Sequence, residues 1–122
     1  MEMEKPYVIG IDMGGTNTVF GIVDARGNVV AKGAIKTDNP DIDAYILDLK
    51  TELDKQIESV GGIDKIKGIG AGCPNGNFYT GNIEFAPNLP WKGVVPFAKL
   101  LSDSFGVPAA ITNDANAAAV GE

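Results

Sequence analysis

The first third of the chain alternates apolar runs with short polar turns. Tyr7–Ile11 is apolar on both faces, which is typical of a central strand in a sheet. The runs Thr18–Val23 and Val29–Lys36 follow the polar turns Asp12–Asn17 and Asp24–Asn28. Because both turns are short, the three runs predict an antiparallel meander.

A helical period replaces this alternation near residue 40. Asp38-Asn39-Pro40-Asp41 carries helix-start signals, namely an Asp or Asn cap, a proline near the first helical position and acidic residues in the first turn. Apolar residues then recur every three or four positions and predict one amphipathic helix of about five turns. They are Ile42, Ile46, Leu49, Leu53, Ile57 and Val60. Gly61-Gly62 is expected to end the helix.

The rest of the chain predicts further strands and helices in alternation. Ile66–Gly72 is a short glycine-rich strand that leads into a long polar turn region, and Phe97–Phe105 has helical spacing closed by glycine. Val107–Thr112 predicts another buried strand, and the helix-prone run Ala115–Val120 follows it. The predicted order is βββαβαβα, an α/β fold.

Composition narrows the class of protein. A chain of 122 residues with 44% hydrophobic and 21% charged residues predicts one ordinary globular domain. Ten basic against 16 acidic residues give a net charge of −6, which argues against a nucleic-acid partner. There is no histidine to serve as a base or metal ligand, and one cysteine cannot form an internal disulfide. No secretory signal or membrane span is evident, so we expect a cytoplasmic domain without membrane contact.

The turn Asp12-Met13-Gly14-Gly15-Thr16 is a candidate phosphate site. Two glycines permit positive φ and leave the backbone amides open to an anion, and Thr16 adds a hydroxyl donor. Asp12 at the strand end could hold a hydrated Mg²⁺. An ordinary type I′ Gly-Gly hairpin explains the two glycines equally well.

Gly68-Ile69-Gly70-Ala71-Gly72 superficially matches a dinucleotide-binding fingerprint. Cys73 stands where that fingerprint needs its third glycine, and Pro74 follows where a helix would have to begin, so we reject this interpretation. Cys73 itself is expected to be a small buried thiol, since no neighbouring base or cation marks it as activated.

The pair Asn113-Asp114 and the residue Trp91 can each be interpreted as part of a chemical site or as a structural feature. Asp114 follows a buried strand, where a carboxylate could accept a hydroxyl proton while Asn113 binds a neighbouring hydroxyl. Taken alone, capping of the next helix is the simpler explanation of this pair. Trp91, the only tryptophan, could belong to a carbohydrate site, but a cover at the edge of the core is the simpler role.

Four segments, in this order, resemble the ROK family of sugar kinases, especially its bacterial glucokinases. They are Ile9–Asn17, Gly70–Pro74, Ala86–Trp91 and Asn113–Glu122. The resemblance implies a ribonuclease-H-like (actin-like ATPase) fold with a mixed five-stranded sheet in the order βββαβαβ and flanking helices. It also implies that residues 1–122 are the N-terminal lobe of a two-lobed kinase whose C-terminal lobe is absent.

The resemblance assigns roles to individual residues. Asp114 would be the catalytic base. The sugar side would be lined by Asn113, Asn88, Pro74 and Asn75. The nucleotide side would be lined by Asp12, Gly14, Gly15 and Thr16, with Mg²⁺ held by Asp12 through a water. The family usually has glycine where this chain has Asn75.

The function implied for the full-length protein is ATP-dependent phosphorylation of a hexose, glucose to glucose 6-phosphate, with this lobe inactive alone. A homo-oligomer is expected, and the family zinc site would lie in the absent lobe. A kinase for another sugar, such as fructose or an N-acetylated hexosamine, is an alternative. A sugar-responsive transcriptional regulator is a weaker one, because too few residues precede Asp12 for a helix-turn-helix domain. A sugar-binding lobe without catalysis is a third alternative. Asp114 argues against it, because a protein that only binds the sugar does not need a carboxylate at the transferred hydroxyl.

Overall fold

The computed structural model describes residues 5–113, and its main layer is a mixed five-stranded sheet. The strands are β1 (Tyr7–Met13), β2 (Asn17–Val23), β3 (Val29–Lys36), β4 (Ile66–Gly72) and β8 (Ala109–Thr112). Their spatial order is β3-β2-β1-β4-β8. The pairs β1–β2 and β2–β3 are antiparallel, whereas β1–β4 and β4–β8 are parallel. The predicted meander and the mixed sheet are therefore both confirmed.

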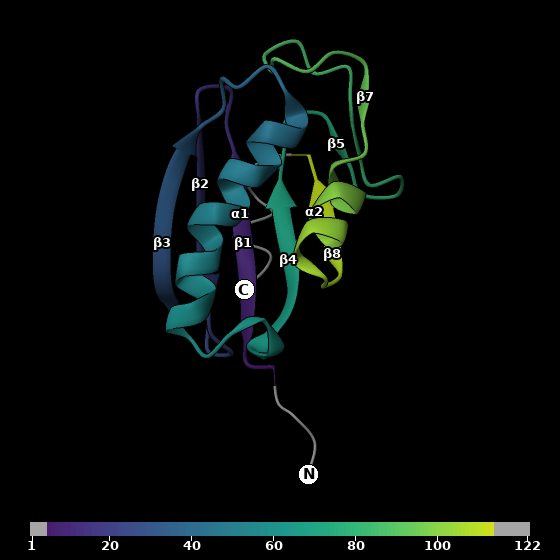
Figure 1. Ribbon diagram of the computed structural model, residues 1–122. Helices are drawn as coiled ribbons and strands as arrows, with labels where there is room; N and C mark the ends of the chain where they lie inside the picture. The colour runs from purple at the N-terminus through teal and green to yellow at the C-terminus, as the bar shows by residue number, and fades with distance from the viewer. Residues whose placement is uncertain (1–4, 114–122) are drawn as a thin grey trace.

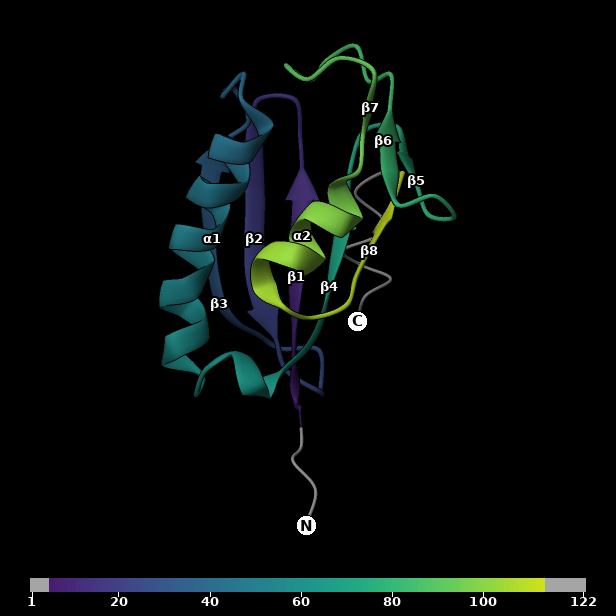
Figure 2. The same cartoon turned by 45° about the vertical axis from the view of Figure 1, so that its right-hand side comes forward.

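Two helices, α1 (Ile42–Ser59) and α2 (Phe97–Phe105), cover the same face of this sheet (Figures 1 and 2). Alternate residues of β1 point toward them, and Ile9 and Ile11 are almost completely buried there. Leu49 and Leu53 from α1 and Leu101 from α2 fill the same layer. Burial of such side chains contributes about 1.5–3 kcal/mol each, so this apolar layer is the main source of stability.

The first helix begins where its sequence signals predict, directly after Asp41. Asp41 is the N-cap, and its side chain accepts a hydrogen bond from the backbone nitrogen of Asp43 at 3.0 Å. Pro40 directly precedes the cap and so lies near the first helical position, as expected. The predicted end is confirmed, because Gly61 and Gly62 both have positive φ and the amide of Gly62 bonds to the carbonyl of Ile57.

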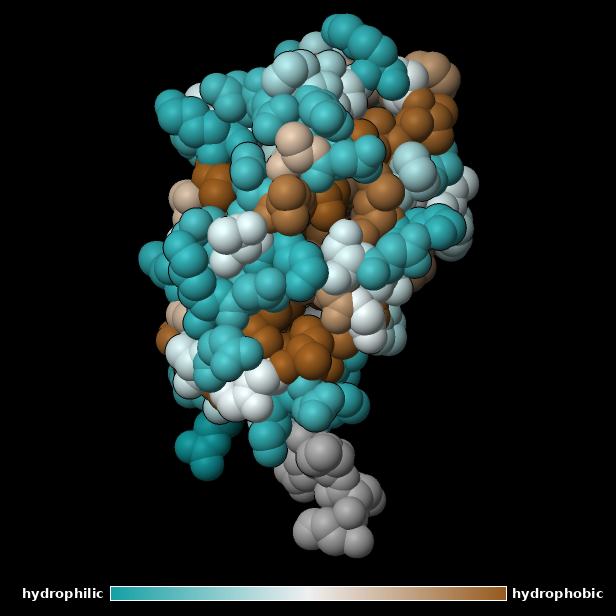
Figure 3. All heavy atoms as spheres, viewed as in Figure 1, coloured by the Kyte–Doolittle hydropathy of each residue, from teal (hydrophilic) through white to brown (hydrophobic). Residues whose placement is uncertain are grey.

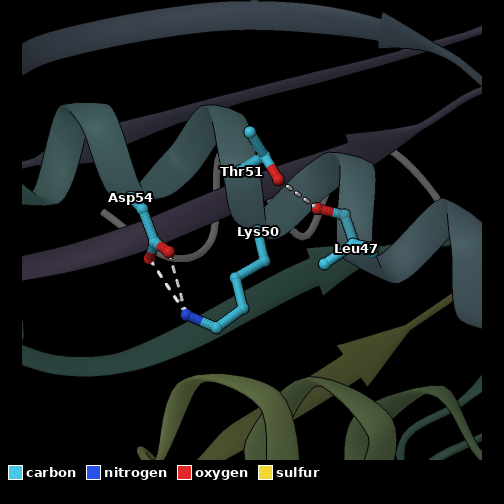
Figure 4. Close-up of polar contacts among 4 residues, drawn as sticks. All are labelled: Leu47, Lys50, Thr51 and Asp54. Atoms are coloured by element: carbon cyan, nitrogen blue, oxygen red, sulfur yellow. Dashed lines mark hydrogen bonds and ion pairs between the residues drawn. The ribbon is translucent and has the colours of Figure 1, made fainter.

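Lys50 joins the two helices. Its ammonium group lies 2.9 Å from an Asp54 carboxylate oxygen one turn further along α1 (Figure 4). The same nitrogen lies 5.4 Å from the centre of the Phe105 ring on α2. Figure 3 shows hydrophobic residues gathered along this seam between the helices. A cation over an aromatic face adds a modest attraction to that packing.

The segment expected to be one long polar turn region instead contains a small second sheet. Its strands are β5 (Gly76–Asn77), β6 (Asn82–Glu84) and β7 (Val94–Val95), paired antiparallel in the order β5-β6-β7. Strands of two or three residues are too short to show an alternating pattern, which explains why the sequence did not predict them. A short 3-10 turn, η1 (Ile63–Lys65), leads into β4.

The opposite face of the main sheet carries no helix among the described residues. Small residues stand side by side on it, because Gly10 is in register with Gly21 and Gly70, and Gly70 with Ala110. Gly10, Gly70 and Ala110, together with Val8 and others, line an apolar hollow of about 460 Å³. Within residues 5–113, no helix is both long and apolar enough to cross a membrane.

Candidate functional site

The candidate site lies where three parallel strands end side by side. Asp12 near the end of β1 is in register with Gly72 of β4, and Gly72 is in register with Thr112 of β8. Neighbouring strands lie about 4.8 Å apart, so Asp12 and Thr112 are separated by roughly 10 Å. Asn113 directly follows Thr112, whereas Asp114 lies outside the described residues. The strand ends that carry the predicted nucleotide and sugar residues thus share one edge, where ligands of α/β folds bind.

The diglycine turn between β1 and β2 is not the turn that either interpretation expected. The amide of Gly14 donates to the carbonyl of Asn17 at 2.9 Å, but neither Gly14 nor Gly15 has a left-handed φ. The type I′ alternative is therefore wrong, because that turn needs positive φ at both central residues. The expected use of positive φ is wrong for the same reason. A Cβ on Gly14 would lie only 3.0 Å from the carbonyl oxygen of Asn17, so what glycine provides here is space.

Asn88 lies beside this turn. A Cβ built on Gly15 would lie 3.5 Å from both the Cβ and the carbonyl oxygen of Asn88. Asn88 was expected on the sugar side together with Asn75 and Asn113, but the structure brings its backbone against the predicted phosphate turn. The loop that carries Asn88 therefore packs against the turn that was predicted to bind phosphate.

A buried chain of hydroxyl groups supports the turn from below. Thr18 Oγ1 lies 2.8 Å from Thr37 Oγ1 and 2.6 Å from the Tyr45 hydroxyl, and all three residues are completely buried. The backbone amide of Thr37 also donates to the carbonyl of Thr16 at 2.9 Å, which ties the turn to the end of β3. Burial raises the pKa of Tyr45, so its hydroxyl keeps its proton and remains able to donate. Tyr45 was not among the residues singled out from the sequence.

Trp91 links this chain of hydroxyls to the loop of Asn88. Its ring centre lies 4.7 Å from that of Tyr45, and its indole nitrogen donates to the carbonyl of Asn39 at 3.0 Å. The side chain is buried, so Trp91 covers the edge of the core and does not offer a face to a ligand. This result agrees with the simpler of the two interpretations of the tryptophan.

Asn75 occupies a left-handed backbone position directly after the half-buried Pro74. Its φ is 57°, a conformation that glycine adopts freely and that asparagine tolerates better than most residues. Its Nδ2 donates to the carbonyls of Glu84 and Phe85 at 3.0 and 3.1 Å. The departure from the family's glycine thus keeps the loop conformation, but it commits the amide nitrogen to the β6 strand. Only the Oδ1 of Asn75 is left to face a ligand.

Asn75 and Asn113 line one surface hollow of about 540 Å³. Phe78, Tyr79 and Glu84 line the same hollow, and sequence reasoning missed all three. The available signal was two adjacent aromatic residues in an otherwise polar stretch. The structure therefore groups Asn75 with Asn113, and Asn88 does not line this hollow.

Cys73 lies under the site and is chemically inert. It is completely buried, as expected, and its amide donates to the carbonyl of Thr112 at 2.9 Å. Burial, with a further contribution from the Asp12 carboxylate, raises the pKa of Cys73 to about 12. Because the thiolate is the nucleophilic form, this residue cannot act as a nucleophile near neutral pH.

A site for hydrated Mg²⁺ requires few protein ligands. Mg²⁺ keeps several waters and is usually bound through one or two carboxylates and substrate phosphates. Asp12 is half-buried at the shared strand edge, and no hydrogen bond among the described residues occupies its carboxylate. The same part of the chain contains no cluster of three or more His, Cys, Asp or Glu side chains that could hold a metal on their own. Asp12 thus fits a water-mediated Mg²⁺ contact and does not fit a closed metal site.

Comparison with known proteins gives relatives of two kinds. The chain is 32% identical over 115 residues to a glucokinase of Streptomyces coelicolor, covering 93% of this chain and 34% of the relative. It is 31% identical over 121 residues to the xylose repressor of Caldicellulosiruptor bescii, covering 94% of this chain and 29% of that protein. The chain therefore spans about a third of the length of the curated relatives it matches.

Solved structures confirm the fold. A ROK family glucokinase from Streptomyces griseus, in complex with glucose and AMPPNP, superimposes with a TM-score of 0.77 at 28% identity, over 95% of this chain and 36% of that one. The ribonuclease-H-like, actin-like ATPase fold with its mixed five-stranded sheet is thus confirmed. The sequence model of the ROK family matches residues 8–122, almost the whole chain. This chain belongs to the ROK family.

Proposed function

We propose that the chain is the N-terminal lobe, residues 1–122, of a two-lobed ATP-dependent hexose kinase that converts glucose to glucose 6-phosphate. The observation that carries the proposal is the alignment of Asp12, Gly72 and Thr112 across three parallel strands, which brings the predicted phosphate turn and Asn113 to one edge. Glucokinases among the relatives support a hexose as substrate, and the share of their length that the chain spans supports a second lobe.

In this proposal, one group of residues binds the nucleotide and another group binds the sugar. The turn Gly14–Thr16 lies against the phosphates of ATP, which accept hydrogen bonds from the amide of Gly15 and the hydroxyl of Thr16, while the Gly14 amide stays bonded to the carbonyl of Asn17. Asp12 orients a hydrated Mg²⁺. When bound, Mg²⁺ supplies positive charge that offsets the charge of the phosphates. Positioning and electrostatic stabilisation of this kind supply most of the rate acceleration in phosphoryl transfer.

On the sugar side, Asn113 and the Pro74–Asn75 loop hold the hexose, while Asn88 marks the boundary with the nucleotide turn. Asp114 accepts the proton of the hexose hydroxyl, most simply that on carbon 6, as its oxygen attacks the γ-phosphorus of ATP. The bond from that phosphorus to the bridging oxygen breaks, and ADP leaves. Residues 1–122 alone are expected to be inactive, because water has access to this edge without the opposite lobe.

The direct test replaces the proposed base in the full-length protein. Asp114→Asn should lower kcat by about two orders of magnitude or more, a typical contribution of general-base catalysis, in a coupled assay of ADP release with glucose. Asp103→Asn on α2 is the matched control, because Asp103 lies on the surface and, within residues 5–113, forms an ion pair with Lys99 alone. Turnover of the Asp114 variant equal to that of the control would remove Asp114 from this role.

A regulator is the second candidate, favoured by the match to the xylose repressor. A panel of hexoses, including fructose and N-acetylated hexosamines, separates the candidates when binding and ADP release are measured on the same full-length protein. Release of ADP with one preferred hexose supports the kinase and identifies the sugar. Hexose binding without ADP release for every sugar in the panel would support the regulator.

A further inference from the structure

The turn between β5 and β6 presents two aromatic side chains to solvent. Phe78 is 58% exposed and Tyr79 is 93% exposed. Their rings meet edge to face, with centres 5.5 Å apart and planes at 81°. Side chains this exposed add almost nothing to the core, so packing within the described structure does not explain them.

This aromatic tip (Phe78 and Tyr79) is held in place by its polar neighbours. Asn77 Oδ1 accepts hydrogen bonds from the backbone nitrogens of Tyr79 and Thr80 at 2.9 and 3.3 Å. Glu84 accepts from the Asn77 amide at 3.2 Å and from the Thr80 hydroxyl at 3.1 Å. The amide of Gly81 closes the turn on the carbonyl of Asn77 at 2.8 Å. A turn fixed in this way loses little conformational entropy when a ligand binds.

The aromatic tip is also fixed relative to the candidate site. Gly76 at the start of β5 packs directly on the end of β8, where an added Cβ would lie 2.6 Å from the carbonyl oxygen of Thr112. Phe78 and Tyr79 therefore share their hollow of about 540 Å³ with Asn113, the residue that follows Thr112, and with Asn75. The hollow is wide open to solvent and is large enough to receive a small molecule on one side.

The groups in this hollow match the chemistry of a pyranose ring. A pyranose has a face of C–H groups that can pack on an aromatic ring, and a rim of hydroxyls that bond to amides. Asn75 Oδ1 and the Asn113 amide supply the polar contacts. Glu84 is the charged side chain of the hollow, and its carboxylate disfavours an anionic ligand there. Both of its oxygens already accept a hydrogen bond, from Asn77 and from Thr80.

We propose that the aromatic tip is the outer wall of the sugar site, on which the hexose packs one face of its ring. This inference rests on the proposed function and extends it, because it assigns sugar recognition to two residues outside the segments that resemble the family. In a kinase of this kind, Tyr79 and Phe78 contact the part of the hexose that points away from ATP.

The experiment uses the full-length protein with Tyr79→Ala and Phe78→Ala, and measures glucose affinity by calorimetry together with KM for glucose and for ATP. At least one variant should weaken glucose binding by about 3- to 10-fold, the scale of one aromatic contact, and leave KM for ATP within about twofold. Leu47→Ala is the control, because Leu47 is an apolar residue on α1 that is about as exposed as Phe78 (62%) and lies outside the hollow.

Glucose affinity unchanged in both variants would overturn the inference. A change of oligomeric state without a change in glucose affinity would also overturn it, since the tip would then be a protein contact. If the unmutated protein binds glucose without releasing ADP, and Tyr79→Ala weakens that binding, the result supports the role of the aromatic tip in sugar binding and contradicts the kinase proposal. If the unmutated protein binds no hexose, both the role of the aromatic tip and the kinase proposal are wrong.

Discussion

At the scale of single residues, Asn75 shows how one substitution can preserve a loop. Its left-handed φ of 57° would strain alanine by about 1–2 kcal/mol, whereas glycine adopts it freely. Asn75→Ala should therefore lower the free energy of unfolding by about that amount, and Asn75→Gly should lower it less, although both remove the bonds to Glu84 and Phe85. Urea unfolding of the two variants checks this. An equal loss of unfolding free energy in both variants would show that the side-chain hydrogen bonds of Asn75, and not its backbone conformation, account for its contribution to stability.

Cys73 gives a pH-dependent prediction. Its pKa is raised from an ordinary 9.0 to about 12, so the folded state holds the thiol proton more tightly than the unfolded chain. The resulting stability is fully present below about pH 9 and is lost as pH rises from 9 through 12. At pH 8 a thiol reagent should react at least about a hundredfold more slowly with the folded chain than with the chain in denaturant. Because Cys73 is the only cysteine, rapid reaction of the folded chain would contradict its burial.

At the scale of elements, the chain of hydroxyls joins β2, the end of β3 and α1 beneath the diglycine turn. Tyr45→Phe removes one hydroxyl and leaves the ring against Trp91, so it should cost about 0.5–1.5 kcal/mol of stability. Amide exchange at Gly14 and Thr37 should become faster in the same variant, because both bond within or to the turn.

Tyr79→Phe is the matched control for that experiment. It removes the same hydroxyl from a side chain that is almost fully exposed, so neither stability nor amide exchange at the turn should change. If Tyr45→Phe behaves like this control, the hydroxyl chain does not support the turn.

Long elements could be predicted from the sequence, whereas very short ones could not. The 18 residues of α1 repeat an apolar period often enough to define one face, and the buried positions Ile46, Leu49, Leu53 and Ile57 all lie on it. Tyr45 is buried beside them but did not stand out, since its role depends on Thr18 and Thr37 from other strands. The small sheet was missed because no strand in it exceeds three residues.

At the scale of the whole molecule, the resemblance predicted which segments belong to the site but not how they are grouped. That Asp12 and Asn113 share an edge follows from parallel strands, and the resemblance implied that topology. That Asn88 lies against Gly15, and that Asn75 lines the same hollow as Phe78 and Tyr79, depends on loop conformations without a local sequence signal. Left-handed Asn75 and Phe85 are examples of such conformations.

The most direct measurement is a crystal structure of the full-length protein with glucose and a non-hydrolysable ATP analogue. The terminal phosphate should lie against the turn Gly14–Thr16, within reach of the Gly15 amide and the Thr16 hydroxyl, and a glucose hydroxyl should lie between that phosphate and Asn113. Either ligand at the opposite end of β1 and β4, or in the apolar hollow lined by Val8 and Gly68, would contradict a shared site at the carboxyl ends of the strands.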